Sequence, residues 1–117
     1  GYSVAYESAG MLFRKLEKNR FTPTEQTQEE VDRIMGCDLL IIDDLGTEMP
    51  NTFVTAALYE LLNERLLSGK PMIISTNFRN DELSSRYSMQ IGSRLSGSFK
   101  GLTFVGEDIR VLKSRGV

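Results

Sequence analysis

Two apolar runs in the sequence end on polar side chains that could do chemistry. Asp43 and Asp44 follow the four aliphatic residues 39–42, and Ser75-Thr76-Asn77 close the run 72–74. Mg²⁺ in proteins is usually held by few carboxylates and keeps several waters, so Asp43 could hold the ion through water beside phosphate oxygens. Asp44 could then orient or deprotonate an attacking water. The pattern favours phosphoryl transfer, which depends on positioning and charge neutralisation.

Two later arginines could add positive charge to this chemistry. Arg94 lies in a helical pattern and Arg110 follows Asp108-Ile109. A guanidinium offers phosphate a rigid, permanently charged fork. Each candidate also has a structural interpretation, since Asp-Asp-Leu-Gly forms turns, Asn77 could cap a helix, and single arginines pack their stems on surfaces. The order of the candidates along the chain favours the functional interpretation.

Alternating strands and helices would have to position these side chains. Apolar periodicity predicts strands over residues 2–7, 38–44, 71–77 and 102–105, and helices over residues 9–19, 27–36, 52–67, 80–86 and 89–95. This order predicts a parallel sheet with right-handed crossovers and helices on both faces. Ligands bind such sheets at the carboxyl ends of the strands, where Asp43 and Asn77 would meet.

Local patterns add detail to this prediction. Aromatic and aliphatic residues alternate with small or polar ones over residues 2–7, which predicts a strand whose aromatic face is the better buried. Four consecutive aliphatics at 39–42 predict a strand covered on both faces. Thr27 and Glu30 have the spacing of a capping box, and Thr52 is expected to cap the next helix.

Composition excludes several classes of site. The chain has 117 residues, 14 Lys and Arg against 16 Asp and Glu, no His, and Cys37 as its single cysteine. Catalytic units that need His, His-ligated metals and cysteine-built zinc sites therefore cannot form within the chain. The length suits one domain. No apolar stretch approaches the roughly 20 residues that cross a bilayer, so we expect a soluble, cytoplasmic protein without a membrane partner.

The combined motifs resemble those of AAA+ ATPases of the DnaC/IstB type, the bacterial replicative helicase loaders and their transposition relatives. The segment Leu39-Leu40-Ile41-Ile42-Asp43-Asp44-Leu45-Gly46 resembles the Walker B strand, and Ile74-Ser75-Thr76-Asn77 resembles sensor 1. Ser93-Arg94-Leu95 resembles the arginine-finger helix of this family. Asp108-Ile109-Arg110 lies where the family has its sensor 2 arginine. The resemblance spans nearly the whole chain.

The resemblance implies ATP and Mg²⁺ as cofactors and a role for each residue. Asp43 would hold Mg²⁺, and Asp44 would be the water-polarising base. Asn77 would lie near the attacking water and the γ-phosphate. Arg94 would reach the nucleotide of a neighbouring subunit, which makes hydrolysis depend on self-association, and Arg110 would contact phosphate within its own subunit. Asp44 stands where the broader AAA+ pattern has Glu, so slow hydrolysis is a hypothesis.

The resemblance also implies a three-layer α/β/α parallel sheet of the P-loop NTPase (AAA+) type. No Gly-x-x-x-x-Gly-Lys-Ser/Thr run occurs in the sequence, so residues 1–117 resemble the C-terminal part of one AAA+ core, after the P-loop. The absent P-loop strand would stand beside the sensor 1 strand. We expect the exposed edge to pair with another copy, to be filled by a rearranged last strand, or to result from trimming of a longer protein, and the chain alone to bind ATP poorly.

Basic and aromatic residues near the N-terminus could contact single-stranded DNA. The candidates are Arg14, Lys15, Lys18, Arg20 and Phe21, with Phe13 beside them. An amphipathic helix with its phenylalanines in the core is the alternative.

The function expected from the resemblance is an ATPase that loads or controls a replicative hexameric helicase on single-stranded DNA. A transposition helper of the IstB type shares every motif. A degenerate AAA+ adaptor without turnover is a further alternative. A receiver-like signalling module is disfavoured, because no further Asp ends a strand between the acidic pair and Ser75.

Overall fold

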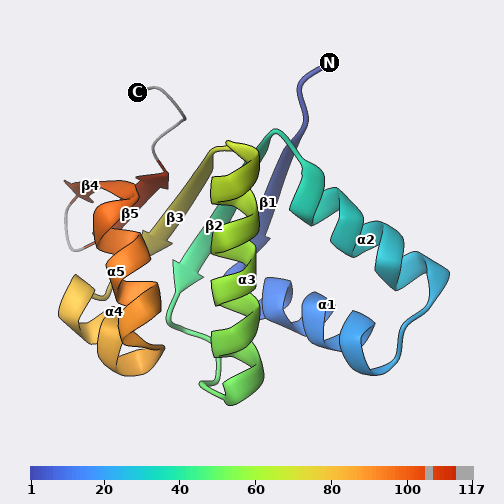
Figure 1. Ribbon diagram of the computed structural model, residues 1–117, viewed down its shortest axis with the longest axis horizontal. Coiled ribbons are helices and arrows are strands. Elements are labelled where there is room, and N and C mark those ends of the chain that lie inside the picture. Colours follow the sequence, from blue (N-terminus) through green and yellow to red (C-terminus); the bar gives the residue numbers. More distant parts are fainter. Residues whose placement is uncertain (105–106, 113–117) are drawn as a thin grey trace.

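The computed structural model describes residues 1–104 and 107–112 of the chain. Within these residues, five strands and five helices follow one another along the sequence (Figure 1). Their bounds are β1 Val4–Ser8, α1 Ala9–Phe21, α2 Glu25–Gly36, β2 Leu39–Leu45, α3 Thr52–Ser68, β3 Met72–Thr76, α4 Asn80–Arg86, α5 Met89–Gly97, β4 Phe99–Phe104 and β5 Glu107–Leu112. The fold belongs to the α/β class, as the sequence predicts.

The described strands form one sheet in the order β1-β2-β3-β5-β4. The first three run parallel, with Ala5 opposite Leu40 and Leu40 opposite Met72. This part of the sheet agrees with the predicted crossovers. The register of β2 against β3 shifts between Ile42 and Leu45, so the pairing becomes irregular where the acidic pair stands.

The last two strands correct the prediction of a parallel sheet. β5 pairs antiparallel with β3, and β4 pairs antiparallel with β5. Only two residues separate β4 from β5, whereas a parallel pair needs a crossover of a dozen residues or more. The predicted strand over residues 102–105 becomes part of β4, and Val105 lies outside the described residues. The last strand therefore fills the position beside β3.

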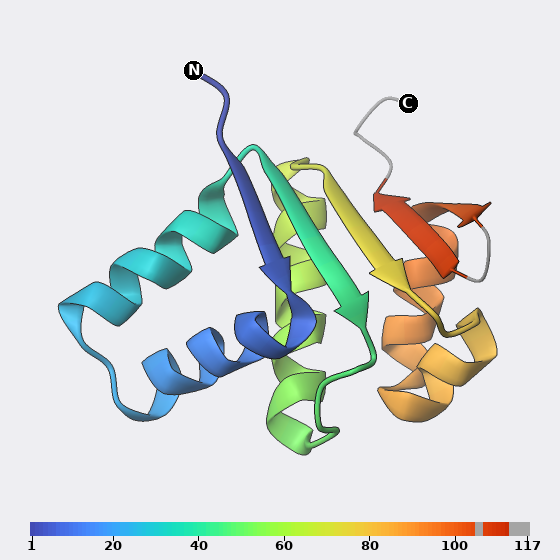
Figure 2. The same cartoon turned by 180° about the vertical axis from the view of Figure 1, so that it is seen from behind.

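The described helices lie on one face of the sheet, which gives two layers where three were predicted. Figure 1 shows α3 and α5 in front of the strands and α4 below the carboxyl end of β3, and Figure 2 shows β1, β2 and β3 in front of α3. Alternate strand residues facing the helices are at most 1% exposed, namely Ala5, Leu40, Ile42, Met72 and Ile74. On the other face, Val4 is 53% and Tyr6 62% exposed, and Ile41 is half-buried.

The predictions about strand faces are therefore wrong at two places. The aromatic face of β1 is its exposed face, and the aliphatics of β2 are fully covered on one face only. Glu7 faces the helices because Lys15 and Arg33 pair with its carboxylate at 2.9 and 3.0 Å. A carboxylate tolerates burial when cations pair with it. Aromatic content alone does not reveal such pairing.

Helix caps explain where α2 and α3 begin. The Thr24 hydroxyl accepts a hydrogen bond from the Thr27 amide at 3.1 Å, and the Thr27 hydroxyl accepts one from the Thr24 amide at 2.8 Å. The predicted box at Thr27 is therefore three residues late. Asn51, rather than Thr52, caps α3 by accepting from the Val54 amide at 2.8 Å. In the described part of the chain, no helix is long and apolar enough to cross a membrane.

Candidate functional site

Asp43 joins three strands at their carboxyl ends. Its Oδ1 accepts a hydrogen bond from the Ser75 hydroxyl of β3 at 2.6 Å. Its Oδ2 accepts one from the Tyr6 hydroxyl of β1 at 2.8 Å. In register, Ser8 of β1 stands opposite Asp43. The carboxylate is therefore held in a fixed orientation on the open face of the sheet.

These hydrogen bonds favour the ionised form of Asp43. The Ser75 hydroxyl, followed by the Tyr6 hydroxyl, lowers the pKa of the Asp43 carboxyl below its ordinary value, against the opposing effect of partial burial. Each carboxylate oxygen has more than one acceptor direction, so both retain capacity for a further partner. A half-buried, ionised and oriented carboxylate at a strand end can bind a cation or a hydrated cation.

Asp44 turns the chain sharply away from the sheet. Its φ is 58°, in the left-handed region that Asp tolerates better than most residues. Its amide donates to the Ser75 hydroxyl at 2.9 Å, and its carbonyl accepts from the Thr47 hydroxyl at 2.8 Å. Ser75 therefore contacts both members of the acidic pair. This left-handed turn interrupts the regular alternation of side chains along β2 directly after Asp43.

The residues around Asn77 bring it to the same end of the sheet. Before it, the Thr76 hydroxyl donates to the Leu45 carbonyl at 2.7 Å. After it, the Phe78 ring fills the space that a side chain at Gly46 would occupy. Asn77 itself is exposed. The structure thus places Asn77 between two contacts to the segment that directly follows the acidic pair.

Of the two candidate arginines, only Arg94 has a side chain among the described residues. Arg94 is exposed on α5, where its guanidinium, after the Asn63 amide, lowers the pKa of the Tyr59 hydroxyl on α3. Within the described chain, no hydrogen bond or ion pair joins Arg94 to Asp43. The backbone of Arg110 lies in β5 opposite Ile74, and its side chain lies outside the described residues. If Arg94 takes part in phosphoryl transfer, it would therefore do so at the site of a second copy of the chain.

A metal ion would find one well-oriented carboxylate here. The described residues contain no group of three or more His, Cys, Asp or Glu side chains that could hold a metal. Asp43 therefore fits an ion that keeps most of its waters and takes its other ligands from phosphate, as Mg²⁺ does. The sequence holds no P-loop run, so a cradle for those phosphates is absent from these 117 residues.

The candidate DNA-contacting residues divide into two groups. Phe13 is 3% exposed, and the Lys15 amine pairs with Glu7 and Glu30 at 2.9 and 2.8 Å, so neither is available to a ligand. The remaining candidates are exposed, namely Arg14, Lys18, Arg20 and Phe21. The last two line a groove of about 470 Å³ between α1, α2 and α3.

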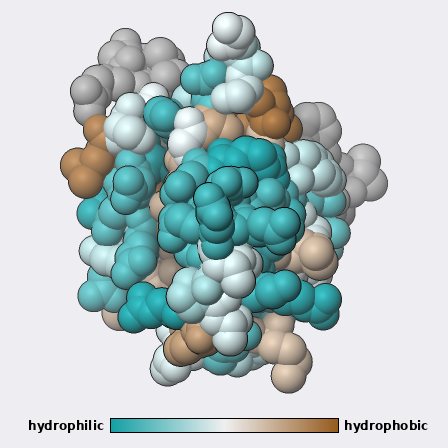
Figure 3. Space-filling model, turned by 90° about the vertical axis from the view of Figure 1, so that its right-hand side faces the viewer, coloured by the Kyte–Doolittle hydropathy of each residue, from teal (hydrophilic) through white to brown (hydrophobic). Residues whose placement is uncertain are grey.

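The surface around the exposed candidates is polar. Figure 3, which faces the side where α1 and α2 lie in Figure 1, is mostly hydrophilic. Phe21 tilts against Phe53 of α3 with 5.7 Å between the ring centroids, so one of its faces is used within the protein.

Three residues of this region were missed by the sequence analysis. Tyr6 and Ser75 orient Asp43, and Glu48 is buried in the loop after it with 8% of its surface exposed. Ser75 stood in the quoted motif, and its position at a strand end could have indicated it. Tyr6 and Glu48 have partners 37 and 39 residues away, and no local pattern shows such contacts.

Comparisons with known proteins give no family for the chain. No protein-family model, no curated protein and no solved structure matches it.

Proposed function

We propose that this chain is the post-P-loop part of an AAA+ ATPase of the helicase-loader type, which uses ATP and Mg²⁺ to control a replicative helicase on single-stranded DNA. One observation carries the proposal. The carboxylate that the resemblance assigns to the metal, Asp43, is hydrogen-bonded to Ser75 of the sensor-like strand at 2.6 Å. A surface Asp in a turn would be ionised as well, but it would have no reason to be half-buried and hydrogen-bonded to a neighbouring strand.

The chain's own residues supply distinct parts of the proposed site. Asp43, fixed by Tyr6 and Ser75, would hold the waters of a bound magnesium ion. Asp44 would orient the attacking water, and exposed Asn77 would contact that water or the terminal phosphate. The magnesium ion would neutralise the charge that develops on the phosphates. Arg94, exposed on α5, would leave its contact with Tyr59 and enter the site of a second subunit.

The strand order bears on one part of this proposal, the place of the P-loop strand. The resemblance places a P-loop strand beside β3, and in the structure β5 occupies that position as an antiparallel partner. Of the three expectations for this edge, a rearranged last strand describes the arrangement. In a longer chain the P-loop strand would compete with β5 for the edge of β3. The proposal therefore expects weak ATP binding by residues 1–117 alone.

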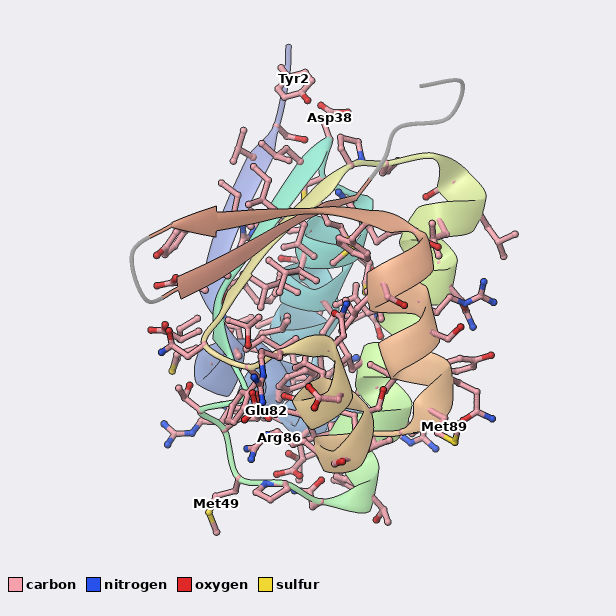
Figure 4. All side chains as sticks on the ribbon, turned by 90° about the vertical axis from the view of Figure 1, so that its left-hand side faces the viewer. Tyr2, Asp38, Met49, Glu82, Arg86 and Met89 are labelled. Carbon is pink, nitrogen blue, oxygen red and sulfur yellow. The ribbon has the colours of Figure 1, made fainter. Side chains whose placement is uncertain are left out.

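The test is hydrolysis by the protein with any sequence that its gene encodes before Gly1. We expect Asp43→Asn and Asp44→Asn each to lower single-turnover ATP hydrolysis by about 100-fold or more. Asp38→Asn is the matched control, because Asp38 directly precedes β2 at the end opposite Asp43 and accepts hydrogen bonds from Ser3 at 2.7 and 3.1 Å. Figure 4 shows Asp38 far from the loop that carries Met49. If Asp43→Asn and Asp44→Asn hydrolysed ATP as fast as the wild type and Asp38→Asn, the proposed site would be rejected.

A further inference from the structure

A buried polar cluster ties the loop after the acidic pair to helix α4. We call it the Glu48 cluster, and it consists of Gly46, Glu48, Phe78, Arg86 and Tyr87. The side chain of Glu48 is 4% exposed and that of Arg86 19%. Figure 4 shows Arg86 on α4 beside the loop that carries Met49. None of these residues belongs to the resemblance described above except Gly46.

Every oxygen of the Glu48 carboxylate has a partner. Oε1 accepts from the Gly46 amide at 3.0 Å, two residues after Asp44. Oε2 accepts from the Tyr87 hydroxyl at 2.6 Å and pairs with the Arg86 guanidinium at 3.3 Å. The guanidinium also donates to the Glu48 carbonyl. Because a buried carboxylate is costly unless fully paired, these contacts allow the loop few other conformations.

Aromatic packing restricts the same loop from the sheet side. The Arg86 guanidinium lies 5.6 Å from the Phe78 ring centroid and 5.8 Å from that of Tyr87. The Phe78 ring lies so close to Gly46 that no Cβ fits there, and the φ of Gly46 is 107°. Gly46 therefore has both a steric and a conformational requirement for glycine. Phe78 directly follows Asn77, so the cluster contacts the segments after both polar strand ends.

Helix α5 is fixed to α4 in turn. Tyr87 directly precedes Ser88, whose hydroxyl caps α5 by accepting from the Ile91 amide at 3.1 Å. Ser84 of α4 occupies the space where a side chain at Gly92 would lie. Arg94 follows Gly92 by two residues. A continuous set of packed contacts therefore leads from the loop after Asp44, through α4, to the helix that carries Arg94.

We propose that Glu48 and Arg86 are positioning residues that couple the loop after Asp43 and Asp44 to the helix that carries Arg94. This inference rests on the proposed function. In it, the conformation of a subunit's own Asp44 turn sets the placement of the arginine it offers to its neighbour. Asp44 at φ 58° and Gly46 at φ 107° form a turn that needs external restraint, and Glu48 supplies it.

The experiment uses the same gene-encoded protein and separates nucleotide affinity from the chemical step. Glu48→Gln keeps an acceptor for the Gly46 amide and loses the charge, and Arg86→Lys keeps the charge and loses the planar fork. We expect each to slow single-turnover hydrolysis about tenfold or more while the Kd for magnesium-ATP stays within about twofold. Tyr87→Phe, which removes one hydroxyl and keeps the ring, is expected to slow hydrolysis about twofold to fivefold.

The matched controls are Glu82→Gln and Arg79→Lys, the same changes in an exposed ion pair at the start of α4. They are expected to leave both the rate and the Kd unchanged. Unfolding midpoints show which variants are folded at the assay temperature. If Glu48→Gln and Arg86→Lys are unfolded there, the rate of Tyr87→Phe is the test of the inference. Folded variants with wild-type rates would overturn the inference alone. A wild-type protein that neither binds nor hydrolyses ATP, or one unaffected by Asp43→Asn, would overturn the proposed function as well.

Discussion

Arg65 shows how a single residue can fix the far end of this sheet. It is fully buried on α3, and its guanidinium donates to the carbonyls of Met35, Cys37 and Pro71. Burial lowers the pKa of Arg65 below its ordinary value, although arginine remains charged at neutral pH. The three carbonyls belong to the end of α2, to the residue after it and to the residue directly before β3. One charge therefore joins three elements at the end opposite Asp43.

We expect Arg65→Met to lower the free energy of unfolding by about 3 kcal/mol, since methionine fills part of the space and removes the guanidinium donor from all three carbonyls. Of the three, the Pro71 carbonyl keeps another donor, the Leu40 amide at 3.3 Å. Urea denaturation followed by circular dichroism measures the change. Arg20→Met, at an exposed position, is the control and is expected to be neutral within about 0.5 kcal/mol. A similar loss in both variants would show that the buried hydrogen bonds of Arg65 contribute little.

At the scale of elements, the sequence predicts the helices better than the sheet. Apolar residues recur at helical spacing in α1, α2, α3 and α5, so the existence and approximate bounds of these helices follow from periodicity. Helix α4 contains only one apolar residue, Leu83. The cap of α2 was misplaced, because Thr24 and Thr27 carry the same chemistry three residues apart. Strand partners and faces depend on contacts distant in sequence, such as Glu7 with Arg33, and these are invisible to a local pattern.

The ion pairs that bury Glu7 also predict how stability depends on pH. Arg33, followed by Lys15, lowers the pKa of Glu30 from 4.5 to about 2. A carboxyl whose pKa is lowered by folding contributes fully above its unfolded value near pH 4.5, and the contribution is lost as the pH falls toward 2. Solvent screening of the partly exposed pair limits it to about 1 kcal/mol.

The expected result is a pH-dependent difference between the wild type and Glu30→Gln. Urea denaturation should give the wild type about 1 kcal/mol more stability at pH 6, and the difference should vanish near pH 2. Comparing two proteins cancels the contributions of Asp38 and Asp43, whose pKa values are also lowered. A difference that stays constant between pH 6 and pH 2 would contradict the assignment of the low pKa to Glu30.

At the scale of the whole molecule, the sequence predicts the location of the candidate site, at the carboxyl ends of the parallel strands. It does not predict the side-chain contacts made there. The parallel order of β1, β2 and β3 brings Asp43 and Ser75 together, as expected from the rule for carboxyl ends of strands. The hydroxyl of Tyr6 could not be expected there, because its strand was assigned the opposite face. The number of layers could not be predicted either. Four aliphatic residues at 39–42 are compatible with a strand that is covered on one face and with a strand that is covered on both.

A pair of neighbouring residues tests the two-layer arrangement directly. Ile42 is 0% exposed toward the helices, and Ile41, next to it on β2, is half-buried on the open face. We expect Ile42→Ala to cost about 3–4 kcal/mol of unfolding free energy and Ile41→Ala about 1 kcal/mol, because only the first leaves an enclosed cavity. The two changes remove the same atoms from the same strand, so β propensity cancels in the comparison. Equal losses, measured by urea denaturation of residues 1–117, would mean that the open face is covered in solution and that the sheet lies between two layers.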